Sequence, residues 1–192
     1  MPVLFFQGDK MQRTYTEKQY RGLISRASGA SFEDIISSVC NTYSTNKIAK
    51  IEKQQEPVKM IKPMNRLGQF LACFTQRAGV DYKGTIMGGK SVAFEAKHTD
   101  TDRMLKTRLQ PWQHEYLEEH KNLGAITFIL ISFKMQNFYR IPLDVWDNMK
   151  EIYGRQYLTE KDIAEYKIKD KGFFVDFLAG FYDENALPQL LR

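Results

Sequence analysis

The chain has 192 residues, of which 43% are hydrophobic and 13% aromatic, and this composition excludes an intrinsically disordered protein. The length suits one domain with a substantial core, so we expect a single domain over residues 1–192. The longest apolar run, Ala125–Phe133, is too short to cross a bilayer, so no membrane partner is expected.

The net charge of +5 is concentrated in the N-terminal third. Residues 1–66 contain 11 Lys and Arg against 6 Asp and Glu, whereas residues 67–192 are balanced at 17 of each. Six basic residues crowd one short stretch: Lys47, Lys50, Lys53, Lys59, Lys62 and Arg66. A polyanion is therefore the expected partner, although a solvated basic face would have the same composition.

The first residues and the cysteines are set apart from the fold. Residues 1–9 resemble the remnant of a protease site added for expression, so we expect residues 1–10 to be a tag or a disordered N-terminus. Met11 would then be the native start. Cys40 and Cys73 lack metal-ligand spacing and are expected to be reduced thiols in a cytosolic protein.

The first predicted element is a helix from Ser31 to about Thr45. Ser31 is followed three residues later by Asp34, which is typical of a helix start, and apolar residues then recur at helical spacing. Alternating apolar and polar residues predict a strand over Ile48–Gln54. Two prolines interrupt the next segment, and Arg66–Arg77 is predicted to be either a helix or part of a projecting arm.

A hairpin over Asp81–Lys97 follows, with a Gly-Gly turn at its centre. The next stretch, Thr99–Arg108, is polar and predicts a surface loop. A helix is expected from Pro111 to about Lys121, since proline suits a first helical turn. The remaining expected elements are a buried strand at Ala125–Phe133, a strand at Asn137–Ile141, helices at Leu143–Tyr153 and Thr159–Tyr166, and a short strand at Phe173–Phe177. This order predicts an α/β fold with a mixed central sheet.

Three polar residues of the hairpin carry the chemical prediction. Glu95 and Lys97 alternate along one strand and so share a face, and a tight hairpin brings Asp81 beside them. Carboxylates are ligands for a hard cation such as Mg²⁺, and the backbone carbonyl of Ala96 can add a further oxygen. Lys97 can then orient or deprotonate an attacking water, or offset charge on a phosphate. The pattern is that of D…ExK metal-dependent nucleases, although an isolated Glu-x-Lys is a weak signal.

Two further residues are candidates with ordinary alternatives. Glu33, on the first turn of the predicted helix, can complement the helix dipole, or it can hold a metal-bound water. Gln113 lies at the start of the helix after the hairpin, and by itself it would be interpreted as an ordinary exposed polar residue.

The chain resembles the RecU-type Holliday junction resolvases, a branch of the PD-(D/E)xK nuclease superfamily, from about Arg21 to Phe177. The most specific matches are Asp81-Tyr82-Lys83-Gly84 and Phe94-Glu95-Ala96-Lys97-His98-Thr99. The loop Thr101–Lys106 departs from the family, which has a phenylalanine-proline pair there.

This resemblance implies a restriction-endonuclease-like nuclease core, with a mixed sheet flanked by helices and a protruding stalk at about residues 56–79. It implies Asp81 and Glu95 as metal ligands, Lys97 as the catalytic lysine, and Glu33 and Gln113 as further residues of the active site. Ala96 would lend its backbone carbonyl to Mg²⁺ or Mn²⁺, and Glu33 would act through water. The basic residues of the stalk, which would bind DNA, are Lys59, Lys62, Arg66 and Arg77.

The first functional hypothesis is a homodimeric, Mg²⁺ or Mn²⁺-dependent endonuclease that resolves four-way DNA junctions in recombination and repair. Two symmetric cuts require two sites, and a two-fold dimer matches a two-fold junction. A bacterial or phage protein acting in the cytoplasm, with a recombinase as a further partner, is expected on this view. The alternatives are a nuclease of the same superfamily acting on flaps, ends or duplex DNA, and a non-catalytic factor that binds branched DNA.

Overall fold

The computed structural model describes residues 17–55, 58–63, 70–74, 79–169 and 174–187. A five-stranded sheet forms the centre, in the order β1-β4-β5-β7-β8. Its strands are β1 (Ala49–Lys53), β4 (Tyr82–Ile86), β5 (Lys90–Thr99), β7 (Ile126–Phe133) and β8 (Asn137–Pro142). Only β5 and β7 pair in parallel among these neighbours, so the predicted mixed sheet is confirmed.

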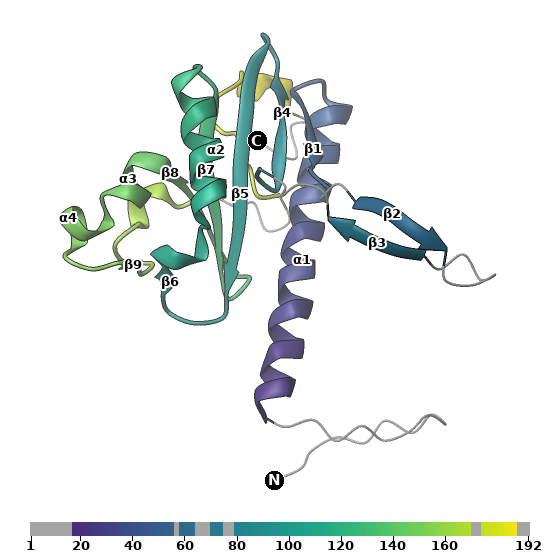
Figure 1. Cartoon of the computed structure of the whole chain (residues 1–192). Helices are drawn as coiled ribbons and strands as arrows, with labels where there is room; N and C mark the ends of the chain where they lie inside the picture. The colour runs from purple at the N-terminus through teal and green to yellow at the C-terminus, as the bar shows by residue number, and fades with distance from the viewer. Residues whose placement is uncertain (1–16, 56–57, 64–69, 75–78, 170–173, 188–192) are drawn as a thin grey trace, which may run out of the picture.

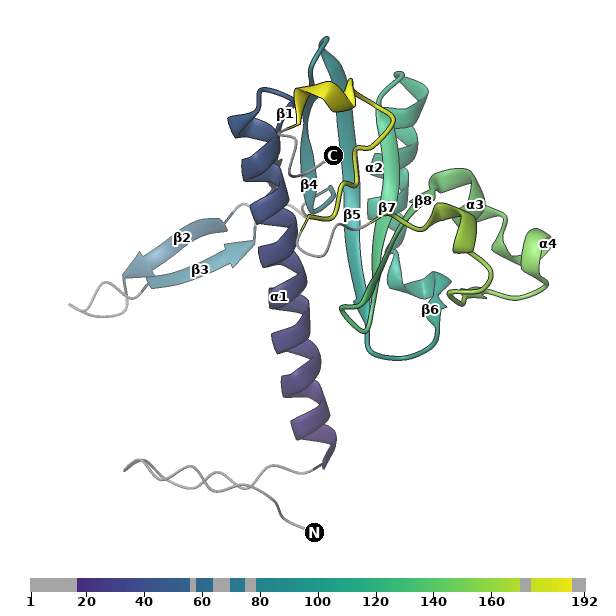
Figure 2. The same ribbon diagram turned by 180° about the vertical axis from the view of Figure 1, so that it is seen from behind.

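One helix covers each face of this sheet (Figure 1). The long helix α1 (Glu17–Thr45) packs its residues Phe32, Ile36 and Tyr43 onto one face. The opposite face is covered by α2 (Pro111–Asn122), whose Leu117 belongs to a second buried cluster. Figure 2 shows the first face, with α1 in front of β1 and with β4 visible beside the helix. Because α2 connects the parallel strands β5 and β7, these three elements form a β-α-β unit. The expectation of a mixed sheet flanked by helices is confirmed.

Stacked aromatic rings fix the register of the three central strands. Tyr82, Phe94 and Phe128 are cross-strand partners on β4, β5 and β7. Their rings stack with centroid distances of 5.0 Å and 4.8 Å, and all three are almost fully buried on the α1 side. Since alternate residues of a strand face opposite sides, the residues next to these rings must face α2.

Two strands between β1 and β4 form a separate sheet, the β2–β3 hairpin, that projects away from the central sheet in both views (Figures 1 and 2). It pairs β2 (Val58–Pro63) with β3 (Phe70–Phe74) in antiparallel fashion. The helical alternative is therefore wrong for Phe70–Phe74. Lys59 and Lys62 are exposed on β2, whereas the other two expected DNA-binding residues, Arg66 and Arg77, lie outside the described residues.

Most of the smaller elements lie beyond β8 and beside α2. They are β6 (Met104–Leu105), η1 (Lys106–Arg108), α3 (Leu143–Asp147), α4 (Met149–Tyr153), β9 (Tyr157–Leu158) and η2 (Ala164–Tyr166). The last, η3 (Glu184–Ala186), lies on the α1 side of the sheet, where Ala186 packs against the buried cluster (Figure 2). The helices expected over Leu143–Tyr153 are confirmed as the two short helices α3 and α4. In the described parts of the chain, no helix is long and apolar enough to cross a membrane.

One expected helix start and one expected helix are wrong. The described part of the first helix extends from Glu17 through Ser31, so the cap-like Ser31 and Asp34 lie inside it. A capping sequence stabilises a helix start but does not stop a helix that continues through it. The expected helix at Thr159–Tyr166 is a turn followed by η2. The Asp162 carboxylate accepts hydrogen bonds from the backbone N–H and the hydroxyl of Thr159, at 2.7 Å and 2.6 Å, and these local bonds stabilise a turn as well as a cap.

Two further expectations are corrected by long-range pairing. The stretch Thr99–Arg108 is not simply a surface loop, because β6 pairs with β9 and buries Met104 completely. The described part of the expected strand at Phe173–Phe177 forms no strand; Phe174 and Phe177 instead place their rings edge-on against Tyr43 of α1. Phe173 lies outside the described residues.

Candidate active site

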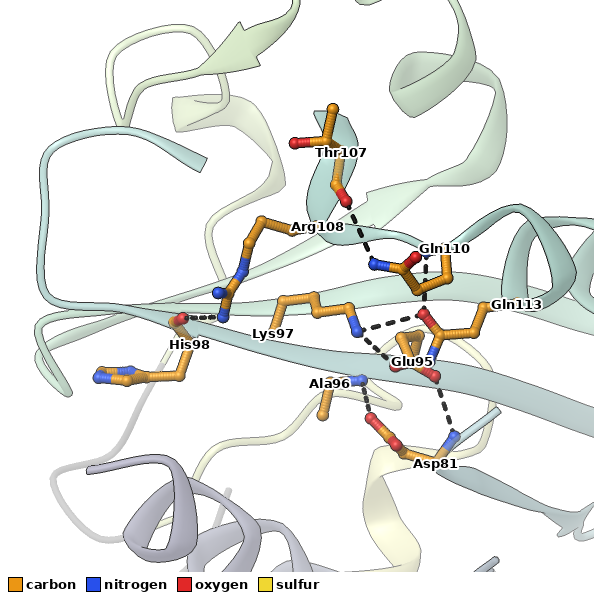
Figure 3. A network of polar contacts seen from close by, with 9 residues as sticks. All are labelled: Asp81, Glu95, Ala96, Lys97, His98, Thr107, Arg108, Gln110 and Gln113. Carbon is orange, nitrogen blue, oxygen red and sulfur yellow. Dashed lines mark hydrogen bonds and ion pairs between the residues drawn. The ribbon is translucent and has the colours of Figure 1, made fainter. Parts of the chain in front are cut away.

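The strand register places two carboxylates next to each other at the end of β4. Asp81 immediately precedes β4 and lies opposite Glu95, because the next residues, Tyr82 and Phe94, are partners. The backbone N–H of Asp81 donates to Glu95 Oε2 at 3.0 Å, and the backbone N–H of Ala96 donates to Asp81 Oδ2 at 3.0 Å (Figure 3). Each carboxylate is thus held by the backbone beside the other, which fixes their separation.

Lys97 and Gln113 complete the cluster. The Lys97 ammonium donates to Glu95 Oε1 at 2.6 Å and to Gln113 Oε1 at 3.3 Å. The Gln113 amide donates to the same Glu95 oxygen at 2.5 Å. Figure 3 shows Lys97, Glu95 and Gln113 directed toward one another between β5 and the start of α2. Four of the five expected site residues are therefore brought together.

The start of α2 explains how Gln113 reaches the sheet. Pro111 occupies the first turn of the helix, where a missing N–H costs nothing. Gln113 is two residues further on, and its side-chain oxygen accepts the backbone N–H of Gln110 at 3.0 Å. One amide therefore satisfies an otherwise unpaired donor at the helix start and orients Glu95 and Lys97.

Glu95 is the only acidic side chain that is fully buried among the described residues, with 1% of its surface exposed. Burial, and after it the charge of Asp81, raise the pKa of Glu95 to about 7, although the Lys97 ammonium acts in the opposite direction. This carboxyl group therefore keeps its proton up to about pH 7, and additional positive charge nearby would favour its ionised form.

The cluster fits a hard divalent cation. Two adjacent carboxylates of which one is buried leave negative charge that a cation would neutralise, and their oxygens suit Mg²⁺ or Mn²⁺. No group of three or more His, Cys, Asp or Glu side chains that could hold a metal exists in the described parts of the chain. The donor set would therefore be Asp81, Glu95, the Ala96 carbonyl and water, which suits a cation that keeps several waters.

Glu33 is not drawn into this cluster. Its carboxylate accepts from the Lys53 ammonium of β1 at 2.5 Å, and both side chains are about half exposed. The pair links α1 to β1 on the sheet face opposite α2. The role of Glu33 through a bound water stays a prediction.

Two neighbours of the site were missed from the sequence. Arg108 donates from Nη2 to the backbone carbonyl of His98 at 3.3 Å, one residue beyond Lys97. Gly79, two residues before Asp81, packs directly against the Tyr116 ring of α2. Neither residue belongs to a recognisable pattern, because both contacts depend on where α2 and the segment leading to it pack.

A methyl group at Gly79 is expected to disturb the site. A Cβ there would lie 2.2 Å from the Tyr116 ring, so the ring or the chain leading to Asp81 must move. Overpacking of this kind costs about 1–3 kcal/mol, so Gly79→Ala should lower the free energy of unfolding by that amount and slow any reaction that uses Asp81. Thermal unfolding and DNA cleavage measure the two effects. Adding Tyr116→Ala should recover part of the loss, and a Gly79→Ala protein as stable and active as wild type would contradict the packing argument.

The fold and this cluster define an α/β domain with a carboxylate–lysine centre on its sheet. The chain matches the family model described as "RecU: Recombination protein U" over residues 27–182, and it belongs to that family.

Relatives with the same family name are similar along most of the chain. The chain is 28% identical over 145 residues to Holliday junction resolvase RecU of Streptococcus pneumoniae (strain Hungary19A-6), covering 72% of this chain and 73% of the relative. It is 29% identical over 146 residues to Holliday junction resolvase RecU of Bacillus subtilis (strain 168), covering 71% and 69%. Among solved structures, the Archaeoglobus fulgidus Holliday junction resolvase Hjc is a distant likeness, with 12% identity, a TM-score of 0.42, and coverage of 74% of this chain and 91% of that one.

Proposed function

We propose that this chain is a divalent-metal-dependent endonuclease that resolves four-way DNA junctions by paired, symmetric phosphodiester hydrolysis. The observation that carries the proposal is the contact of Asp81, Glu95, Lys97 and Gln113 within a chain of the RecU family. The relatives named above are junction resolvases, which supports the same substrate here.

Each residue has a defined part in this mechanism. Asp81, Glu95 and the Ala96 carbonyl would hold Mg²⁺ or Mn²⁺, and a bound cation would polarise the scissile phosphate and lower the pKa of water. Lys97 lies where it can donate to the attacking water or to a phosphate oxygen. Gln113 keeps Glu95 and Lys97 in place through its two bonds. Glu33 would take part only through an intervening water.

The arrangement of the substrate follows from the same proposal. The residues described in one chain offer one such cluster, so paired cuts would require a homodimer whose two-fold axis matches that of the junction. The projecting β2–β3 hairpin carries the exposed Lys59 and Lys62, which suit contacts with DNA phosphates. Arg66 and Arg77 would add to these contacts. The setting would be recombination in the cytoplasm of a bacterium, where a recombinase is the expected partner.

Cleavage of synthetic DNA with and without divalent ions tests the proposal. A four-way junction should be cut at symmetric positions in Mg²⁺ or Mn²⁺, cutting should stop on chelation, and it should return when the ion is restored. A linear duplex of the same sequence and a flap substrate serve as controls. Equal cutting of all three substrates would favour a nuclease of broader specificity. Junction binding with no cutting under any ion would favour a non-catalytic branched-DNA-binding factor.

A further inference from the structure

Arg108 lies beside the candidate active site, at its outer edge. It ends the short helix η1, which leads through Gln110 into α2. Its guanidinium donates one hydrogen bond, at 3.3 Å, to the backbone carbonyl of His98. Figure 3 shows Arg108 on the same side of β5 as Lys97, with its guanidinium resting over the strand. The structure thus holds an arginine next to the catalytic lysine predicted above.

The charge of Arg108 is not neutralised by an acid within the described residues. The acceptor of its hydrogen bond is the neutral carbonyl of His98, and the other four of its five N–H donors take no part in that bond. Several lysines are ion-paired instead: Lys53 with Glu33, Lys50 with Glu52, Lys121 with Asp144 and Lys134 with Asp102. The other basic residue of η1, Lys106, donates to the Asp147 carbonyl at 2.5 Å and is half-buried. Arg108 is exposed and is therefore the basic group of η1 that can meet an external anion.

The spacing along β5 indicates which anion this is. Glu95, Lys97 and the His98 carbonyl follow one another toward the end of the strand, and a strand advances about 3.3 Å per residue. Successive phosphates of one DNA strand are more than about 3.4 Å apart, because that value is only their separation along the helix axis. Arg108 is anchored one residue beyond Lys97, at the His98 carbonyl, so its long side chain lies where it can meet the phosphate next to one bound at Lys97.

We propose that Arg108 binds the DNA phosphate adjacent to the scissile one and so positions the strand for cleavage. This inference rests on the proposed function. An arginine suits the task because its planar guanidinium can bind a phosphate through two parallel hydrogen bonds. The bond to the His98 carbonyl presets the side chain in its working position, so less conformational entropy is lost when DNA binds.

Arg108→Gln and Arg108→Lys test this position by single-turnover cleavage of a four-way junction. Arg108→Gln should lower the cleavage rate about 10- to 100-fold, the effect of losing a hydrogen bond between charged groups. Arg108→Lys should retain part of the rate because it keeps the charge but loses the paired geometry. The slope of log binding constant against log salt should fall by about 0.9 for the glutamine variant, as expected for one lost phosphate contact. Lys161→Gln, which removes an exposed charge elsewhere, should cleave as wild type does.

A neutral methylphosphonate placed in turn at the phosphates flanking the scissile bond separates strand positioning from a structural effect. Wild type should be slowed at one adjacent phosphate, and Arg108→Gln should show no further loss at that position. The inference is overturned if Arg108→Gln cleaves at the wild-type rate, or if the variant is as sensitive as wild type at every position. If Arg108→Gln unfolds, Arg108→Lys carries the same substrate scan. Wild-type protein that cuts no junction would contradict the proposed function itself, an outcome distinct from equal cutting by wild type and variant.

Discussion

Lys97→Met should reduce junction cleavage by about 100- to 1,000-fold, the usual effect of removing one group that stabilises transition-state charge. Methionine keeps an unbranched side chain of similar length, so the buried stem is preserved while the ammonium is lost. The ammonium contacts both Glu95 at 2.6 Å and Gln113 at 3.3 Å, so the variant also removes the nearest positive charge from Glu95. Because Lys97 lowers the pKa of Glu95, its loss should raise that pKa further.

Cleavage and binding must be measured separately to interpret this variant. Junction binding without divalent ions should stay within a few-fold of wild type, since the hairpin and other basic residues supply most phosphate contacts. Lys150→Met makes the same chemical change on the exposed surface of α4, a helix that lies apart from β5 in Figure 1, and it should leave cleavage intact. A Lys97→Met protein that cuts junctions at the wild-type rate would remove Lys97 from the mechanism.

The core of this site can be predicted from sequence because its geometry is local. Asp81, Glu95 and Lys97 belong to one hairpin, and the turn glycines Gly88 and Gly89 have φ values of 89° and 87°, which glycine adopts without strain. Strand alternation then determines which side chains share a face. Once the turn is placed, the spacing of the two acids and the lysine follows with little input from the rest of the fold.

The outer residues of the site depend on contacts between distant parts of the chain. Gln113 reaches Glu95 because α2 packs across β5 and β7, and only the family resemblance identified it from sequence. Arg108 is placed by η1, which follows the β6–β9 pair, and β9 lies about fifty residues further along the chain. Such long-range pairing leaves no periodic pattern, so Thr99–Arg108 resembled an ordinary polar loop.

Glu33 shows the opposite case, in which a local pattern is insufficient. Its position on a predicted first turn suggested a role at a helix start, but α1 extends well before it. Its carboxylate pairs with Lys53 on the sheet face opposite α2. A sequence motif identifies the residue type, whereas the distance to the metal ligands depends on how the helix crosses the sheet.

Glu95→Gln should remove a pH dependence of folding stability that the metal-free wild-type protein shows between about pH 4.5 and pH 7. Burial and the neighbouring Asp81 raise the pKa of Glu95 from 4.5 to about 7, so the folded state holds a proton that the unfolded state has lost in this range. The stability linked to this proton is fully present below pH 4.5 and is lost as the pH rises through about 7. The loss should be on the order of 3 kcal/mol. Urea unfolding at a series of pH values in chelator measures it, and Glu118→Gln, an exposed change on α2, should keep the wild-type slope.

The same buried charge predicts how divalent ions act on stability. A cation bound by Asp81 and Glu95 needs both carboxylates ionised, so Mg²⁺ or Mn²⁺ should raise the unfolding temperature of wild type more at pH 8 than at pH 5.5. The Glu95→Gln variant lacks one ionised ligand and should show little ion-dependent stabilisation at either pH. Stabilisation of both proteins by the same amount would place the ion elsewhere on the chain. If only the wild-type protein is stabilised, and more strongly at the higher pH, then the cation neutralises the negative charge of the ionised Asp81 and Glu95 carboxylates.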